Sequence, residues 1–210
     1  MAITTEQVKD LRDKTGVSIM QCRKAVEDAG GDTEKAIITL RKKSGDLAGK
    51  RADKTFGAGT VQSYIHATGT VGAMVVLMCE TDFVSGNDAF KTLARDIAMH
   101  VTAAKPKFIR LTDITEAERA QVKEVLEEEM KKADAEKAAA NGVANKPKPA
   151  EMVAKILEGK LASYFGEMVL LNQPFIKNPE ITIQGLIDSA VQKFGEKIEV
   201  ARFTRLGVAE

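Results

Sequence analysis

The residues best suited to a specific interaction form one short run: Glu80, Thr81, Asp82, Phe83 and Val84. The run follows the most apolar stretch of the chain, and the end of a rigid strand can hold a side chain in a fixed position. In one interpretation Phe83 projects as an apolar wedge and Asp82 offers a carboxylate to a partner. In the other, Phe83 folds back into the core and Asp82 caps a turn. The residue types alone leave both interpretations open.

The usual signatures of catalytic, metal and nucleotide sites are missing. His66 and His100 have no Ser, Cys or acidic partner at a catalytic spacing. Cys22 and Cys79 are far apart and have no second pair at a metal-ligand spacing. The segment 45–51 approaches a phosphate-binding loop, but it is too short and lacks the Ser or Thr after its lysine. We therefore expect neither an enzyme nor a bound metal or cofactor.

The composition also limits the classes of partner. Lys and Arg total 31 against 30 Asp and Glu, so the basic excess typical of nucleic-acid binding is missing. No stretch approaches the roughly 18 apolar residues of a membrane span, and the N-terminus is polar from Thr4 to Gln7. We expect a soluble cytoplasmic protein that binds neither nucleic acid nor membrane.

Residues 1–43 are predicted to form a three-helix module. Capping residues start each helical pattern, namely Thr4 with Gln7, Ser18 with Gln21, and Asp32. Helices this short are marginal alone and must pack on each other. From residue 44 to 59 the composition shifts to Gly, Ala, Lys and Asp, which predicts a linker.

Residues 60–210 are predicted to form the core domain, with a three-stranded antiparallel sheet. Alternation from Val61 to Ile65 and an apolar run over 71–79 indicate a hairpin whose second strand is buried on both faces. A helix capped by Asn87 follows, and the last strand spans 197–206.

A protruding helical hairpin is predicted over about 115–165. Thr115 and Glu118 form a capping box at its start, and prolines break the chain within 142–149. The predicted fold class is therefore α+β: the N-terminal three-helix module, then the three-stranded antiparallel sheet packed with helices, and the hairpin.

Two long segments resemble the signatures of a known family. Residues 11–25, Leu-Arg-Asp-Lys-Thr-Gly-Val-Ser-Ile-Met-Gln-Cys-Arg-Lys-Ala, resemble the N-terminal signature of the elongation factor Ts family, and residues 79–84 resemble its second signature. Shorter similarities occur at 97–100, 158–160 and 171–175. The resemblance spans nearly the whole chain, and both signatures occur in the family's order.

The resemblance implies a role for each signature. In that family a ubiquitin-associated-like three-helix module docks on the GTPase domain of GDP-bound elongation factor Tu. The implied docking residues here are Leu11, Thr15, Gly16, Ile19, Met20, Cys22 and Lys24. Thr81, Asp82, Phe83 and Val84 would dislodge magnesium from the partner. His66 is implied as a further contact near the partner's phosphates.

The implied activity is guanine nucleotide exchange without covalent chemistry. If the protein favours a GTPase conformation with a broken magnesium shell, protein and nucleotide weaken each other's binding by the same factor. Short members of the family tend to act as homodimers, and the doubly apolar strand agrees with this. The alternative is a ubiquitin-associated-like adaptor or dimerisation protein without exchange activity.

Overall fold

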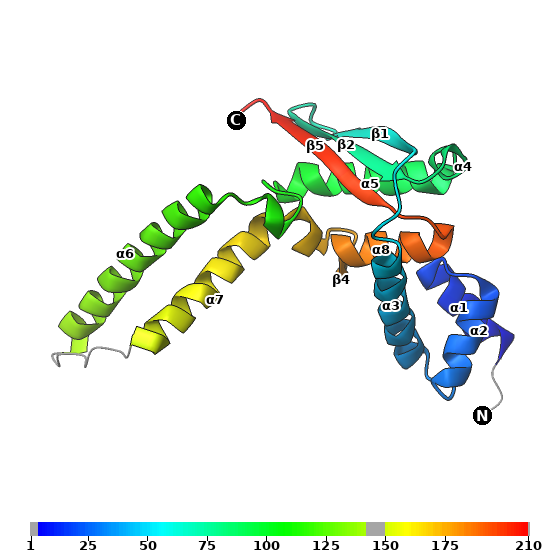
Figure 1. Cartoon of the computed structure of the whole chain (residues 1–210), viewed down its shortest axis with the longest axis horizontal. Helices are drawn as coiled ribbons and strands as arrows, with labels where there is room; N and C mark the ends of the chain where they lie inside the picture. The colour runs from blue at the N-terminus through cyan, green and yellow to red at the C-terminus, as the bar shows by residue number, and fades with distance from the viewer. Residues whose placement is uncertain (1–3, 142–149, 210) are drawn as a thin grey trace. The chain divides into compact units, whose positions relative to one another are not determined.

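The computed structural model describes the backbone of residues 4–141 and 150–209 and the side chains of residues 4–133 and 152–209. The chain divides into two compact units, one of residues up to 105 together with those from 174, the other of residues 106–173. The predicted α+β class is confirmed, with an N-terminal helical module, a three-stranded antiparallel sheet and a pair of long helices (Figure 1).

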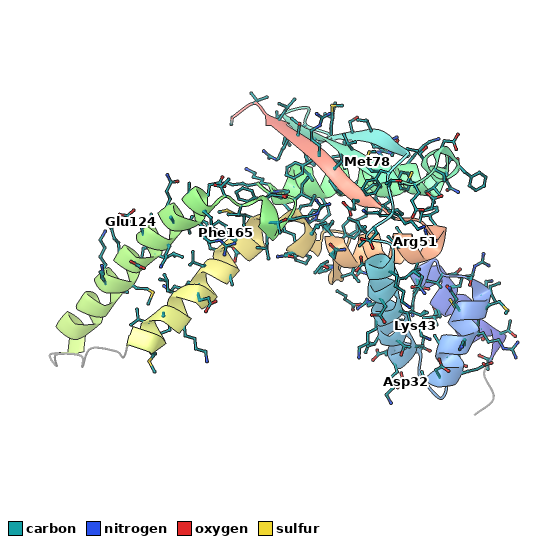
Figure 2. All side chains as sticks on the ribbon, viewed as in Figure 1. Asp32, Lys43, Arg51, Met78, Glu124 and Phe165 are labelled. Atoms are coloured by element: carbon teal, nitrogen blue, oxygen red, sulfur yellow. The ribbon has the colours of Figure 1, made fainter. Side chains whose placement is uncertain are left out.

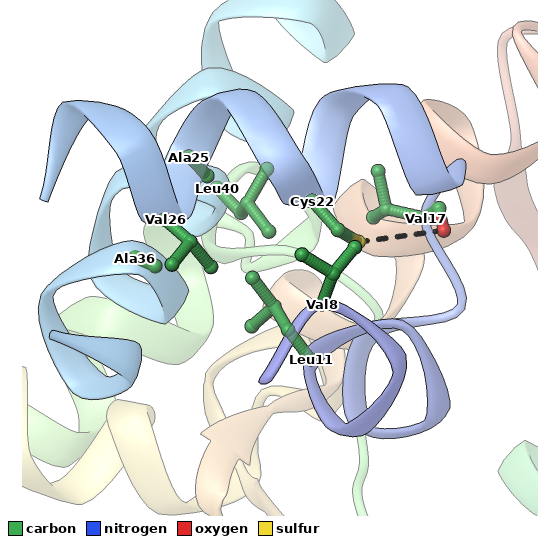
Figure 3. Close-up of a cluster of buried hydrophobic side chains, with 8 residues drawn as sticks. All are labelled: Val8, Leu11, Val17, Cys22, Ala25, Val26, Ala36 and Leu40. Carbon is green, nitrogen blue, oxygen red and sulfur yellow. Dashed lines mark hydrogen bonds between the residues drawn. The ribbon is translucent and has the colours of Figure 1, made fainter. Parts of the chain in front are cut away.

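The N-terminal module consists of helices α1 (Thr5–Thr15), α2 (Ile19–Asp28) and α3 (Thr33–Lys50). The three predicted caps are present: Thr4 forms a capping box, and Ser18 and Asp32 accept backbone hydrogen bonds at the starts of α2 and α3. These bonds satisfy amide groups that have no partner within the helix. Figure 3 shows the core of the module, which consists of Val8, Leu11, Val17, Cys22, Ala25, Val26, Ala36 and Leu40.

Helix α3 continues to Lys50, so the structure differs from the predicted linker over residues 44–50. The C-terminal half of α3 packs on helix α8 (Ile183–Phe194). Ser44 is buried there, and its hydroxyl group is hydrogen bonded to the side chain of Gln192. This tertiary contact overrides the weak helix propensity of Gly45 and Gly49, which had suggested a linker.

The main sheet contains strands β1 (Ala58–Ile65), β2 (Val71–Cys79) and β5 (Glu199–Gly207), all antiparallel, in the order β1-β2-β5. Helix α5 (Asp88–Ala104) packs on β1 and β2. On β2, alternate residues from Ala73 to Cys79 are buried.

The opposite face of β2 is not buried within the chain. Met74 is 52% exposed, and Val76 and Met78 are half-buried. The prediction of a strand buried on both faces is therefore wrong for a single copy of the chain.

The short elements escaped sequence analysis. Helix α4 (Asp82–Ser85) is one turn long, and strands β3 (Pro174–Phe175) and β4 (Asn178–Thr182) form a separate two-stranded antiparallel sheet. Helix α4 and strand β3 carry too few residues to show a period, and β4 begins with Asn178 and Pro179, which are unfavourable in strands.

The second unit contains helices α6 (Glu116–Asn141) and α7 (Ala150–Met168) and the short 3₁₀ turns η1 (Leu111–Asp113) and η2 (Leu170–Asn172). The predicted capping box joins Thr115 and Glu118. Helices α6 and α7 pack on each other, as the predicted hairpin requires, and Figure 2 shows Phe165 on α7. The predicted break at 142–149 lies outside the described residues. The cluster near the base of the helices consists of Ile114, Phe165 and Val169, with Phe108, Val122, Leu161 and Leu171 against it.

Candidate functional site

The exposed turn after β2 is the first part of the candidate site, and we call residues Thr81–Val84 the tip. Thr81 is the N-cap of α4, and its hydroxyl oxygen accepts a hydrogen bond from the amide of Val84 at 3.5 Å. Phe83 is 85% exposed, whereas Val84 is buried. The interpretation in which Phe83 folds back into the core is therefore wrong, because Val84 anchors the turn and Phe83 projects into solvent.

Asp82 lies in the first turn of α4 and is exposed. Its carbonyl oxygen accepts hydrogen bonds from the Ser85 hydroxyl at 3.0 Å and the Gly86 amide at 2.8 Å. The backbone of the turn is therefore fixed from within, while the Asp82 carboxylate faces water. An apolar ring and a carboxylate are thus presented on adjacent residues.

Glu80 connects the start of the tip to the rest of its unit. One carboxylate oxygen accepts hydrogen bonds from the Lys197 amide at 2.6 Å and from the Arg51 guanidinium at 2.7 Å. Burial alone would raise the pKa of Glu80, but the bond from the Lys197 amide and the neighbouring Arg51 lower it below its ordinary value overall. Glu80 therefore stays ionised.

Lys197 holds the segment between α3 and β1 against the same region. Its ammonium group donates to the carbonyl oxygens of Ala52, at 2.5 Å, and Lys54, at 3.1 Å, and it lies 4.6 Å from the centre of the Phe56 ring. Arg51 and Lys197 were missed in the sequence because they are far from Glu80 along the chain. No local spacing could reveal that they meet.

The predicted docking residues in the N-terminal module divide into two groups. Ile19 and Met20 at the start of α2 are exposed, Met20 to 81%, and Lys24 is exposed one turn further on. Leu11 and Cys22 are completely buried, and Figure 3 shows their side chains within the core of the module. They hold the helices together and have no surface to offer a partner.

Thr15 and Gly16 shape the connection between α1 and α2. The Thr15 hydroxyl donates to the Leu11 carbonyl oxygen at 2.7 Å, and its oxygen accepts the Val17 amide at 3.4 Å. Gly16 adopts φ 67°, a left-handed conformation that glycine takes with little strain at the end of a helix. The connection sets where α2 begins, and thus where Ile19 is exposed.

The two histidines lie in different environments. His66 is exposed after β1, with its ring 6.4 Å from that of Tyr64. A cavity of about 340 Å³ beside it is lined by Tyr64, His66, Val71, Met99, Thr102, Ala103 and Ile176. His100 is buried, and its Nδ1 accepts the Ile176 amide at 3.4 Å. His66 alone is available to a partner.

Other kinds of site find little support. Residues 45–50 lie within helix α3, so they do not form a phosphate-binding loop. Cys22 and Cys79 are free and buried. Among the residues that the structure describes, no three or more His, Cys, Asp or Glu side chains are grouped so as to hold a metal ion. Within the same residues, no helix combines the length and apolar character needed to cross a bilayer.

Comparison with known proteins agrees with this arrangement. The family model described as Elongation factor TS matches residues 4–210. A protein named Elongation factor Ts from Thermodesulfovibrio yellowstonii is 44% identical over 210 residues, covering 100% of this chain and 98% of that protein. One of the same name from Carboxydothermus hydrogenoformans is 43% identical over 208 residues, covering 99% of this chain and 90% of that protein. With an exposed tip, a three-helix module and both similarities spanning nearly its whole length, this chain belongs to the elongation factor Ts family.

Proposed function

We propose that this chain is a guanine nucleotide exchange factor of translation elongation, which binds GDP-bound elongation factor Tu in the cytoplasm and promotes release of GDP. Membership of the elongation factor Ts family supports this function, and the adaptor alternative is not favoured. The observation that carries the mechanism is the exposure of Phe83 on a capped turn. Burying an exposed apolar ring in a partner lowers the free energy of the complex.

The tip acts by disturbing the magnesium and phosphate site of the partner. Phe83 enters the partner as a wedge, and the Asp82 carboxylate interacts with groups released from the magnesium shell. Magnesium requires near-ideal octahedral oxygen coordination, so a small displacement of its ligands strongly weakens magnesium binding. Protein and nucleotide then weaken each other's binding by an equal factor, and no covalent bond is made or broken.

The N-terminal module supplies the docking contacts. Ile19, Met20 and Lys24 present a small apolar surface beside a positive charge. Thr15 and Gly16 position that surface, and Leu11 and Cys22 support it from the core of the module. His66 provides a second contact near the partner's phosphates. Because the N-terminal module docks and the tip displaces magnesium, substitutions in the module should mainly change affinity and substitutions in the tip should mainly change the exchange rate.

We further propose that the protein is a homodimer through the open face of its sheet. The exposed side chains there come from all three strands or their ends and include Val61, Ile65, Met74, Leu206 and Val208. A shallow groove of about 490 Å³ lies on this face. A twofold axis would place the same apolar surface of a second copy against it, as an isologous interface requires.

The decisive experiment is release of fluorescent GDP from elongation factor Tu, measured with and without this protein at millimolar magnesium. Acceleration that saturates with protein concentration is expected of an exchange factor. An adaptor would bind elongation factor Tu, as seen by calorimetry, without changing the rate of GDP release. Binding without acceleration would therefore overturn the proposed function.

A further inference from the structure

Glu196 makes three hydrogen bonds to the tip and to Glu80 just before it. It follows Gly195, the residue that ends α8 in a left-handed conformation. One Glu196 carboxylate oxygen accepts the backbone amides of Glu80 at 3.1 Å and Thr81 at 3.0 Å. The other accepts the Thr81 hydroxyl at 2.5 Å. One carboxylate thus binds three donors at the start of the tip, and such charge-assisted bonds are stronger than neutral ones.

The bond to the Thr81 hydroxyl orients the cap of α4. A hydroxyl group has one proton and two lone pairs. Because the Thr81 proton points to Glu196, a lone pair is left to accept the Val84 amide. The Thr81 carbonyl oxygen also accepts a bond from the Cys79 thiol at 3.2 Å. Glu196 therefore sets the rotamer of the residue on which the turn carrying Asp82 and Phe83 begins.

A second bond joins the Glu80 segment to the Glu196 segment, with donor and acceptor segments exchanged. Glu80 accepts the Lys197 amide, so each of the acidic residues Glu80 and Glu196 binds backbone of the other's segment. Arg51, the C-cap of α3, adds an ion pair to Glu80 at 2.7 Å. Gly57 passes so close that a Cβ atom there would lie 2.6 Å from the Glu80 carbonyl oxygen. The base of the tip is therefore fixed from three segments of the chain.

From this geometry we infer that Glu196 is a positioning residue for nucleotide exchange, which holds the tip in the conformation that projects Phe83. The inference rests on the proposed function of the tip. Val84 anchors one end of the turn by burial, and Glu196 fixes the other end by hydrogen bonds. Without the carboxylate, the tip keeps its apolar anchor but loses its orientation. A wedge that samples several directions enters its target less often.

The contribution to stability is expected to be small, because the neighbouring elements have their own support. Strand β5 begins beyond Glu196 and pairs with β2 from Glu199 onward, and α8 ends before it with its own cap. Glu196 is half-buried at the surface. Its removal therefore leaves the sheet ladder and the packing of α8 in place.

The test compares Glu196→Ala and Glu196→Gln with the parent protein in GDP release from elongation factor Tu, over a range of exchange-factor concentrations. The maximal rate is expected to fall roughly tenfold or more in Glu196→Ala, since small misplacements of a positioned group have effects of that size. Glu196→Gln retains one acceptor oxygen and should lie between the two. The half-saturating concentration should change by less than about twofold, because Ile19 and Met20 are untouched. Glu124→Gln, an exposed residue on α6 labelled in Figure 2, is the charge-matched control.

A double-mutant cycle then asks whether Glu196 acts through the tip. In a Thr81→Val background, Glu196→Ala should cause a smaller loss of maximal rate than it does in the parent, because the hydroxyl contact is already gone. The inference is overturned if the losses of maximal rate in the two single variants simply add in the double variant. It is also overturned if Glu196→Ala keeps the parental maximal rate, or if it changes only the half-saturating concentration. Phe83→Ala is measured in parallel. If Phe83→Ala exchanges at the parental rate, the proposed function of the tip fails; if only Glu196→Ala does, the positioning role alone fails.

Discussion

Phe83 and Phe90 are chemically identical residues in opposite environments, 85% exposed and fully buried respectively. We predict that Phe83→Ala slows GDP release from elongation factor Tu by about tenfold or more, since truncating an apolar anchor costs roughly 2 kcal/mol and each 1.4 kcal/mol is tenfold. The melting temperature should hardly change, because the exposed ring contributes nothing to the core. Stopped-flow release of fluorescent GDP and thermal unfolding measure the two effects.

Phe90→Ala provides the matched contrast. Its ring packs edge-on against that of Phe194, with centroids 5.9 Å apart. Truncating a core phenylalanine costs about 3–5 kcal/mol of unfolding free energy. Phe90→Ala should therefore melt earlier than the parent, while Phe83→Ala does not. A large stability loss in Phe83→Ala would contradict the wedge.

Asp82 gives a second prediction at this scale, which concerns magnesium. We expect Asp82→Ala to slow GDP release in millimolar magnesium, because the carboxylate would no longer interact with groups around the metal. In excess chelator the metal is already absent, so the difference from the parent should shrink. Asp82→Asn keeps the shape of the side chain and separates charge from size. An equal deficit with and without magnesium would exclude a role directed at the metal shell.

At the scale of elements, the long helices and strands were predictable because their signals are local. Thr4, Ser18, Asp32, Asn87 and Thr115 all cap helices as their spacing indicated. The C-terminal half of α3 was missed, because its stability comes from packing on α8, more than a hundred residues away. The tip could be located from its position after β2, but the residue types did not decide whether Phe83 is exposed. The contacts of Glu80 and Glu196 with Arg51, Lys197 and the tip backbone could not be predicted, because each bond joins segments that are distant in the sequence.

Asp188 on α8 faces α3, where a Cβ atom at Gly45 would lie 3.9 Å from its carboxylate. Burial raises the pKa of Asp188 on α8 above its ordinary value, and a bond from the Gln184 amide group at 2.7 Å only partly offsets this. A raised carboxyl pKa means that ionisation is less favourable in the folded state than in the unfolded state. The folded protein is therefore penalised at neutral pH, and the penalty disappears as the pH falls to the ordinary pKa and below it.

We accordingly predict that Asp188→Asn raises the melting temperature at pH 7, since asparagine can still accept the bond from Gln184. The rise should be a few degrees, because 1 kcal/mol corresponds to roughly 2–4 °C in a protein of this size. The gain should decline as the pH is lowered through the raised pKa. Thermal unfolding followed by circular dichroism between pH 4 and 7 measures both effects. Asp53→Asn, at an exposed position, should show neither; a gain independent of pH would contradict the assignment to ionisation.

For the molecule as a whole, the proposed homodimer rests on the open face of the sheet. Its exposed apolar side chains include Val61 on β1, Met74 on β2 and Leu206 on β5, with Thr204 and Arg202 of β5 on the same face, while the other face is covered by α5. Stable interfaces bury about 800 Å² on each partner, and exposed apolar side chains gathered on one face commonly mark such an interface. The two cysteines of the chain are both buried. Association through this face therefore requires no disulfide.

We predict that the protein sediments as a dimer at micromolar concentration in the presence of reductant, and that Met74→Lys makes it monomeric. The substitution would place a lysine from each copy in an apolar interface, and burying unpaired charge costs several kcal/mol, enough to raise the dissociation constant by far more than tenfold. Met152→Lys on α7 is the matched control, because Met152 is 53% exposed and Met74 is 52% exposed. Both variants should keep the parental circular dichroism spectrum, since neither side chain is buried in the chain itself. A parent protein that sediments as a monomer, or a Met74→Lys variant that remains dimeric, would show that this face of the sheet is not where two copies meet.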